Sequence, residues 1–214
     1  MGKVEPIRNM KDILTIEDKL FAMGTPRGDR MFVMFEVGIL LGLRIGDMVK
    51  LKVGDIRDKE SFRFIPEKTD THGDDPKYKP KECYVTIAPE LRNLMRNMFA
   101  GVPDDYPILQ SQRKDPYGRP KRINRQTAWE DMKLIKSMCH IDFPFGCHTL
   151  RKTFGYHVYQ KNHDVAWLQD WFQHSSPAVT LVYIGIADDE KKAVTDHMPF
   201  TDRGRFDYRS KRQK

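Results

Sequence analysis

The chain has 214 residues, of which 39% are hydrophobic and 11% aromatic, enough for one large or two small folded domains. Its formal net charge of +7 fits a polyanionic partner as well as simple solubility, because lysine and arginine bind nucleic acid through its phosphates. The longest apolar run, 31–43, is interrupted by Glu36 and is too short to span a bilayer. No signal peptide is evident, and three scattered cysteines indicate reduced thiols. We therefore expect a soluble cytoplasmic protein with no membrane association.

The N-terminal part predicts two helices. Residues 1–14 are expected to form an extended lead-in, and Thr15 with Asp18 resembles a capping box that opens a helix to about Ala22. A second helix is expected from about residue 28 to 42. Its apolar side chains leave almost no polar face, which is typical of a helix in the centre of a core.

Arg44 follows the end of this second helix and is therefore expected close to the interior. A buried arginine needs an anionic partner. One interpretation is a buried salt bridge, for example to Asp47. The other is that the anion comes from outside, as a phosphate.

The pattern then changes to the alternation that is typical of strands. Residues 62–65 and 84–87 predict an antiparallel hairpin, and residues 55–57 are a candidate third strand. The loop between them is highly polar, and Lys68 stands at its entrance. By default such a lysine is a solvated strand end. Three further lysines share the loop, namely Lys77, Lys79 and Lys81.

Two more helices and a long loop are expected next. One helix runs from Pro89 to Phe99, and another is capped by Asn124 and reaches about Cys139. The inner face of the latter is predicted to carry Trp129, Met132, Ile135 and Met138. Between the helices, residues 101–122 are predicted to be a loop, which ends in a basic cluster formed by Arg119, Lys121 and Arg122.

The stretch from 148 to 183 concentrates residues suited to chemistry. His148 and Arg151 are three apart, so a helix presents both on one face. Further on, Ser176-Pro177 suits the cap and first position of a new helix, which carries Tyr183 about two turns in. Taken singly, such residues usually belong to solvated faces or to the core.

The remaining features are less specific. Residues 188–197 predict a last helix, followed by a basic polar tail over 201–214. The pairs Cys139-His140 and Cys147-His148 fit no common zinc pattern, so we expect no metal site.

Four separated segments together resemble the tyrosine recombinase (phage integrase) family. They are Gly42-Leu43-Arg44-Ile45-Gly46-Asp47, Glu67-Lys68-Thr69, His148-Thr149-Leu150-Arg151, and His174-Ser175-Ser176 leading to Tyr183. The resemblance extends from about residue 5 to 187 and is closest to short, stand-alone integrase-like proteins of Gram-positive bacteria. It departs from the usual pattern at Asp47, where many members have Glu, at Lys152, where many have His, and at Gln173, where glycine is usual.

The resemblance implies a reaction and its residues. Tyr183 would attack a DNA phosphodiester to give a 3′-phosphotyrosyl link, and Arg44, Arg151 and His174 would stabilise the charge on the phosphate oxygens. His148 is the candidate proton acceptor, and Lys68 the candidate general acid on the leaving 5′-oxygen. No metal, ATP or other cofactor is implied.

The resemblance also implies a fold and partners. We expect a mainly α catalytic domain of the tyrosine recombinase type at 15–187, with a small antiparallel hairpin or three-stranded sheet, followed by a C-terminal helix and tail at 188–214. Double-stranded DNA is the expected partner, contacted also by the basic cluster and the loop lysines. The chain is expected to be a monomer when free and a tetramer on paired DNA sites. Larger members close a clamp around DNA with an N-terminal helical domain, which residues 1–14 cannot form, so we expect half a clamp.

Two other functions fit the same residues. A type IB topoisomerase-like enzyme would use the same chemistry to cut, swivel and reseal one strand. A non-catalytic DNA-binding regulator derived from an integrase is the alternative from another class, although intact candidate residues favour an enzyme.

Overall fold

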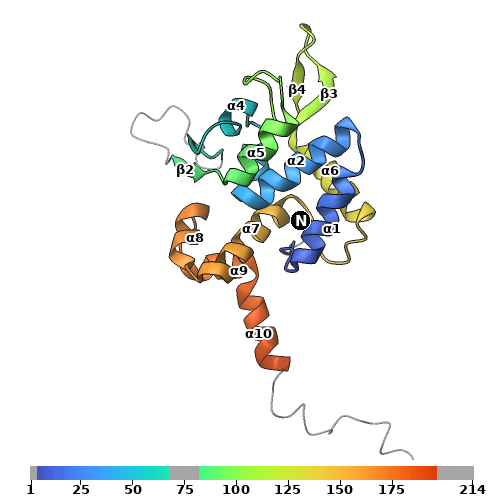
Figure 1. Ribbon diagram of the computed structural model, residues 1–214. Coiled ribbons are helices and arrows are strands. Elements are labelled where there is room, and N and C mark those ends of the chain that lie inside the picture. The colour runs from blue at the N-terminus through green and yellow to red at the C-terminus, as the bar shows by residue number, and fades with distance from the viewer. Residues whose placement is uncertain (1–3, 68–81, 197–214) are drawn as a thin grey trace, which may run out of the picture. The chain divides into compact units, whose positions relative to one another are not determined.

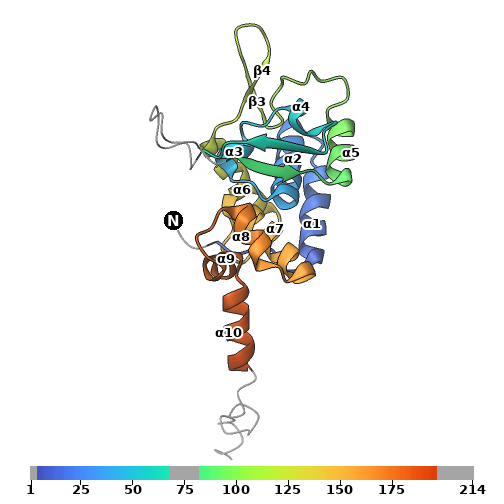
Figure 2. The ribbon, with the colours of Figure 1, turned by 90° about the vertical axis from the view of Figure 1, so that its left-hand side faces the viewer.

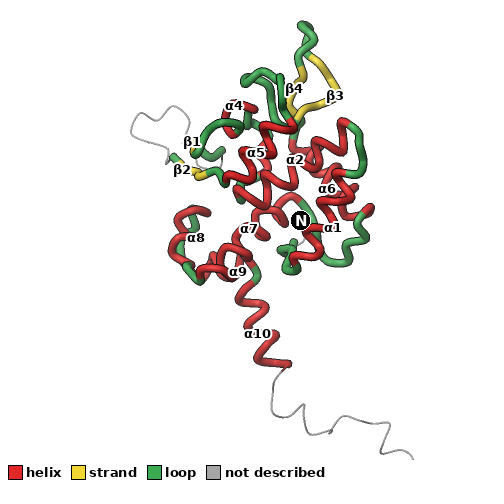
Figure 3. The backbone as a smooth tube through the Cα atoms, viewed as in Figure 1, coloured by secondary structure: helices red, strands yellow, loops and turns green. Residues whose placement is uncertain are grey.

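The computed structural model describes residues 4–67 and 82–196, which form a mainly helical protein with two small antiparallel sheets (Figures 1 and 3). The chain divides into two compact units, residues 1–163 and residues 164–214. The first unit contains α1 (Met10–Phe21), α2 (Pro26–Leu41), α3 (Ile45–Met48), α4 (Val53–Ile56), β1 (Ser61–Phe64), β2 (Cys83–Thr86), α5 (Pro89–Met98), β3 (Gln110–Lys114), β4 (Pro120–Arg122), α6 (Arg125–Met138) and α7 (Cys147–Asn162). The second contains α8 (Val165–Phe172), α9 (Pro177–Ile184) and α10 (Ile186–Asp196).

Helix α1 begins earlier than the sequence predicts. Asn9 is its cap, because the Asn9 side chain accepts a hydrogen bond of 2.9 Å from the backbone N–H of Lys11. Thr15 therefore lies inside the helix, where its hydroxyl donates to the carbonyl of Lys11 at 2.8 Å. The expected extended lead-in to residue 14 was thus wrong for residues 10–14.

Helix α2 is the central core helix that its apolar sequence predicts. Thr25 caps it by accepting from the N–H of Gly28 at 3.1 Å, and Pro26 occupies the first turn, so the helix begins two residues before the predicted start. It ends at Gly42, as predicted, in the left-handed conformation with φ 60°. Its fully buried side chains include Met31, Met34, Phe35, Val37 and Leu41.

Helices α2 and α7 pack unusually closely, because two glycines of the α2 segment lie against α7. A Cβ at Gly38 would come within 2.6 Å of the Leu150 side chain, and a Cβ at Gly42 would overlap the ring of Phe154. Leu150 and Phe154 are one turn apart and are both buried. The absence of side chains at positions 38 and 42 is therefore what brings the two helices together.

The first sheet is the predicted hairpin, but without a third strand. Strands β1 and β2 pair antiparallel, with Phe62 opposite Val85. Residues 55–57 were predicted as a candidate strand, and this was wrong: they belong to and follow the short helix α4. The reason is local, since the Asp55 carboxylate accepts from the backbone N–H of Lys52 at 2.8 Å and so caps a helical turn.

The segment predicted as a loop over 101–122 contains a second hairpin, β3–β4, which projects from the helices around it (Figures 1 and 2). Its turn is built by Asp115, whose carboxylate accepts from the N–H groups of Tyr117 and Arg119 at 2.8 and 2.9 Å. Gly118 supplies the positive φ of 80° that the turn needs. The loop prediction was wrong because both strands are polar and carry no apolar alternation.

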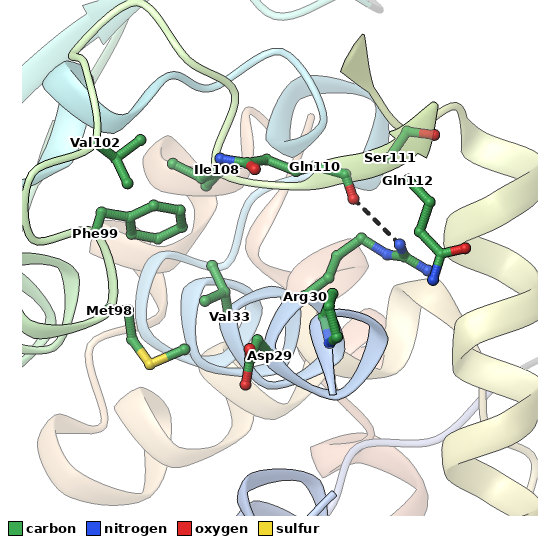
Figure 4. Close-up of a pocket in the computed structure, with 11 residues that line it drawn as sticks. Asp29, Arg30, Val33, Met98, Phe99, Val102, Ile108, Gln110, Ser111 and Gln112 are labelled. Atoms are coloured by element: carbon green, nitrogen blue, oxygen red, sulfur yellow. Dashed lines mark hydrogen bonds between the residues drawn. The ribbon is translucent and has the colours of Figure 1, made fainter. Parts of the chain in front are cut away.

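The base of this hairpin is fixed by a buried ion pair. Arg30 of α2 donates two hydrogen bonds to the carboxylate of Asp131 in α6, at 2.9 and 3.1 Å, and a third of 3.1 Å to the carbonyl of Gln110 in β3. Figure 4 shows the hydrogen bond from the Arg30 guanidinium to Gln110. Both residues line a cavity of about 220 Å³. Asp131 is fully buried, so its charge is balanced only by such partners.

Helices α5 and α6 follow their predicted ranges closely. Asn124 caps α6 by accepting from the N–H of Thr127 at 2.8 Å. Met132 and Ile135 are buried as predicted, but Trp129 is 41% exposed, so its predicted place on the inner face was wrong. Lys133 lies over its ring instead, 4.4 Å from the centroid.

The predicted C-terminal helix is present with slightly different bounds. Helix α10 begins at Ile186 rather than at residue 188, and residue 197 and the tail lie outside the described residues. None of the helices in the described part of the chain has the length and hydropathy needed to cross a membrane.

Gly42→Ala tests the close packing of α2 on α7. The left-handed φ makes alanine cost about 1–2 kcal/mol, and overlap with Phe154 adds about 1–3 kcal/mol. Gly101→Ala is the matched control, because Gly101 has φ 74° and no other atom lies within 4 Å of the point that its Cβ would occupy. Urea unfolding measures the free energy of unfolding. This free energy should fall more for Gly42→Ala than for Gly101→Ala, because only the former overlaps Phe154. Equal losses in the two variants would contradict the close packing.

Candidate active site

Arg151 of α7 is held by the end of α2. It is 4% exposed, and its Nη1 donates a hydrogen bond of 2.5 Å to the carbonyl oxygen of Gly42. The last carbonyls of a helix have no intrahelical partner, so Gly42 offers a strong acceptor at this point. Arg44 follows two residues later, at the cap position of α3. The bond therefore ties the helix of one predicted catalytic arginine to the turn that carries the other.

His148 lies one turn before Arg151 on the same helix, as the sequence predicts. Its pKa is lowered from the ordinary value of 6.5, first by desolvation of the ring and then by the positive charges of Arg151, Arg44 and Lys152. The charges of all three cations therefore act on one imidazole. The neutral imidazole that they favour is the form that can accept a proton.

A cavity of about 300 Å³ adjoins Arg44. It is lined by Arg44, Gly46, Asp47, Glu67 and Arg125. Asp47 is buried, and its Oδ1 accepts a hydrogen bond of 2.9 Å from the backbone N–H of Glu67. Because Glu67 precedes Lys68 in the chain, Asp47 fixes the segment that leads to the predicted general acid. Lys68 itself lies outside the described residues.

The second unit brings two other predicted residues together. The rings of His174 and Tyr183 meet edge to face, with centroids 5.0 Å apart at 75°. Buried Phe172 packs against both, with centroid distances of 5.3 and 5.5 Å. The Nδ1 atom of His174 is 3.1 Å from the hydroxyl of Thr180, which is fully buried and one turn before Tyr183. The imidazole is thus oriented by the helix that carries the tyrosine.

The local sequence explains this arrangement. Ser176 accepts from the N–H of Val179 at 3.3 Å and caps α9 as predicted, with Pro177 in the first turn. Helix α8 ends at Gln173 in the left-handed conformation with φ 53°. Glycine adopts this conformation most readily, which accounts for the glycine that is usual at this position in the family that the sequence resembles.

The predicted site residues thus fall into two groups. Arg44, His148 and Arg151 belong to the first unit, and His174 and Tyr183 to the second. The loop lysines predicted to contact DNA lie outside the described residues, namely Lys77, Lys79 and Lys81. Within the described part of the chain, no group of three His, Cys, Asp or Glu side chains could hold a metal ion, and the three cysteines there form no disulfide.

The basic cluster predicted to bind DNA lies on the β3–β4 hairpin. Arg119, Lys121 and Arg122 are all exposed. At the tip, Tyr117 is 83% exposed, and Arg119 lies over its ring with 5.4 Å to the centroid. An ion pair of 2.8 Å with Asp115 holds Arg119 in place. The hairpin therefore presents a preformed aromatic and basic tip.

Sequence reasoning missed three features of these surroundings. It assigned no role to Arg30 and Asp131, to Arg125, or to Tyr117. A buried-looking Asp131 on the inner face of a predicted helix was a signal for the first, since such a carboxylate needs a cation. The exposed tyrosine beside glycine and arginine at 117–119 was a signal for a turn.

The family follows from a comparison with known protein families. Residues 8–190 match the model of the phage integrase family, which is most of the chain. The chain belongs to this family.

Individual members of the phage integrase family agree with that assignment. The chain is 32% identical over 193 residues to the probable integrase/recombinase YoeC of Bacillus subtilis, covering 90% of this chain and 96% of YoeC. It is 28% identical to a tyrosine recombinase of Pseudothermotoga lettingae, covering 88% of this chain but 63% of that protein.

Solved structures of the same kind share the fold. The crystal structure of XerA recombinase superposes with a TM-score of 0.63 at 19% identity, covering 91% of this chain and 66% of that one. The catalytic domain of bacteriophage HP1 integrase gives a TM-score of 0.56 at 16% identity and covers 92% of this chain and 97% of that domain. The predicted catalytic-domain fold is thereby confirmed.

The charges around His148 can be tested by its titration. We expect its pKa below 6.5, and Arg44→Ala should raise this pKa because one of the nearby positive charges is removed. NMR titration of the histidine rings measures both, with His148→Gln identifying the signal. Arg113→Ala on the hairpin is the control and should leave the titration unchanged. If Arg44→Ala also leaves it unchanged, the cluster of cations is not as described.

Proposed function

We propose that this protein is a site-specific DNA recombinase that cuts and rejoins DNA through a covalent 3′-phosphotyrosyl intermediate at Tyr183. Membership of the phage integrase family supports recombination as the activity. The observation that carries the finer proposal is the pairing of His174 with Tyr183, oriented by Thr180 and Phe172. In this proposal, His174 is the phosphate-binding group beside the nucleophile.

The phosphate is bound by two arginines in this proposal. Arg44 lies in the turn after α2, and Arg151 lies in α7. The hydrogen bond from Arg151 to Gly42 connects this turn and this helix. Guanidinium groups keep their charge at any physiological pH and donate in a planar fork that fits phosphate oxygens. As Tyr183 attacks, negative charge grows on these oxygens, and prepositioned donors stabilise it without reorganising. No ATP is needed, because one phosphoester replaces another, and no metal is needed, because the arginines supply the positive charge.

Two proton transfers complete the step. A tyrosine hydroxyl is a weak acid with an unperturbed pKa of about 10, so Tyr183 must lose its proton as the bond to phosphorus forms. His148 accepts that proton, and its lowered pKa keeps it neutral to more acidic pH than an ordinary histidine. Lys68 gives a proton to the leaving 5′-oxygen, so the broken bond releases a hydroxyl rather than an alkoxide. Religation runs the same steps in reverse with a new 5′-hydroxyl.

DNA is held by the basic surfaces in this proposal. The β3–β4 hairpin carries Arg119, Lys121 and Arg122 on an exposed arm, and Lys77, Lys79 and Lys81 add charge in sequence. Such side chains bind phosphates without reading the base sequence. On paired sites the protein assembles as a tetramer, and free in solution it is a monomer. A lambda integrase dimer bound to a core site has been solved, and its fold matches this chain with a TM-score of 0.58 at 17% identity.

Trapping of the covalent intermediate tests this function. The substrate is a pool of nicked duplexes of random sequence. After cleavage next to the nick, the short fragment diffuses away and religation cannot occur. The protein therefore stays joined to the DNA and is detected in a denaturing gel. The native protein should give this adduct, and sequencing of the captured DNA identifies the site. Tyr183→Phe should bind the same DNA and give no adduct. Adduct formation by the phenylalanine variant would refute the assignment, and Tyr159→Phe is the matched control that should still react.

A further inference from the structure

We propose that Glu67 is an internal stand-in for a DNA phosphate: it holds Arg125 in the cavity beside Arg44, and a phosphate of bound DNA displaces it. This inference rests on the proposed binding of DNA. It adds Arg125 to the residues that contact the substrate and gives Glu67 a role in regulating that contact.

The ion pair has the geometry of an occupied anion site. The Nη2 atom of Arg125 lies 2.5 Å from Oε2 of Glu67, and Lys50 approaches the same oxygen at 3.5 Å. One carboxylate oxygen thus lies between two cations. These contacts lower the pKa of Glu67, so the carboxylate is charged at neutral pH. A phosphate oxygen could take the same place between the two cations.

The cavity is open because position 46 is glycine. A Cβ at Gly46 would clash with the guanidinium of Arg125 and would come within 2.7 Å of Oε2 of Glu67. Without it, the Arg125 side chain crosses the start of α3 and lines the same cavity as Arg44. An anion that enters the cavity therefore meets the guanidinium groups of both arginines.

The charges that line the cavity favour replacement of the Glu67 carboxylate by a phosphate. The cavity lining contains two arginines and two carboxylates, and the Oδ1 atom of Asp47 is engaged by the backbone N–H of Glu67. If the Glu67 side chain swings out, the remaining lining gains one net positive charge. The side chains of Glu67 and Arg125 are 43% and 61% exposed, so both can move without disturbing the core.

Breaking the ion pair between Glu67 and Arg125 costs little free energy. An exposed ion pair of this kind contributes little stability, whereas a DNA phosphate is part of a dense line of negative charge. Bound DNA can therefore replace Glu67, while in the free protein Glu67 keeps Arg125 from other anions.

Binding measurements on Tyr183→Phe protein separate this contact from the chemistry. The probe is a fluorescent duplex of random sequence, titrated over a series of salt concentrations. In this background, Arg125→Ala should flatten the log–log salt dependence by about 0.9, the value for one lost phosphate contact. An unchanged slope would overturn the inference, because Arg125 would then stay with Glu67 or face solvent.

A double-mutant cycle tests the competition. Glu67→Gln should tighten binding about two- to fivefold, as expected when an exposed ion pair no longer has to be broken. In the Arg125→Ala background this gain should shrink clearly, because the pair is already absent. In the Arg122→Ala background, a charge-matched control on the hairpin, the gain should persist. An equal gain in all backgrounds would show a general charge effect and overturn the inference.

Folding and chemistry serve as independent readouts. Thermal unfolding should change by no more than a few degrees in each variant, since the pair is exposed. Adduct formation by the protein with Tyr183 intact reports the proposed recombinase chemistry. A cycle without coupling alongside normal adduct would refute only the role of Glu67 and Arg125, and missing adduct alongside a coupled cycle would refute only the covalent mechanism.

Discussion

The contact between Arg151 and the carbonyl of Gly42 is the interaction on which the group of candidate residues in the first unit depends. Gly42 has three roles at once: its positive φ ends α2, its missing side chain admits Phe154, and its carbonyl holds the guanidinium. The turn that follows then carries Arg44. The core packing of two helices and the placement of two cations are therefore the same structural feature. A larger residue at this position would disturb both stability and charge placement.

Positive charges placed close together repel one another, and nearby carboxylates offset this repulsion. Desolvation and then the nearby positive charges lower the pKa of His148, which suits a proton acceptor. Around Arg44, the carboxylates of Asp47 and Glu67 balance the arginines and also fix the chain before Lys68. The two carboxylates thus bring the charge of the cavity lining close to neutral in the protein without a bound anion.

The sequence predicts the parts of this protein that obey local rules. The apolar run of α2, the cap at Asn124 and the Ser176-Pro177 start of α9 were all predictable, because each depends on neighbours a few residues away. The β3–β4 hairpin was not, since its strands are short and polar and are paired by a turn rather than by an apolar face. The pairs Arg30–Asp131 and Glu67–Arg125 were also missed, because they join residues 101 and 58 positions apart. The family resemblance named candidate catalytic residues, but it could not show that Gly42 contacts Arg151 or that Thr180 contacts His174.

The central claim is that Tyr183 forms the covalent bond to DNA. Mass spectrometry of the trapped adduct, after nuclease and protease digestion, tests it most directly. We predict a single modified peptide that contains Tyr183, with the nucleotide attached through its 3′-phosphate. A nucleotide on Tyr159 or any other residue, or one attached through a 5′-phosphate, would contradict it.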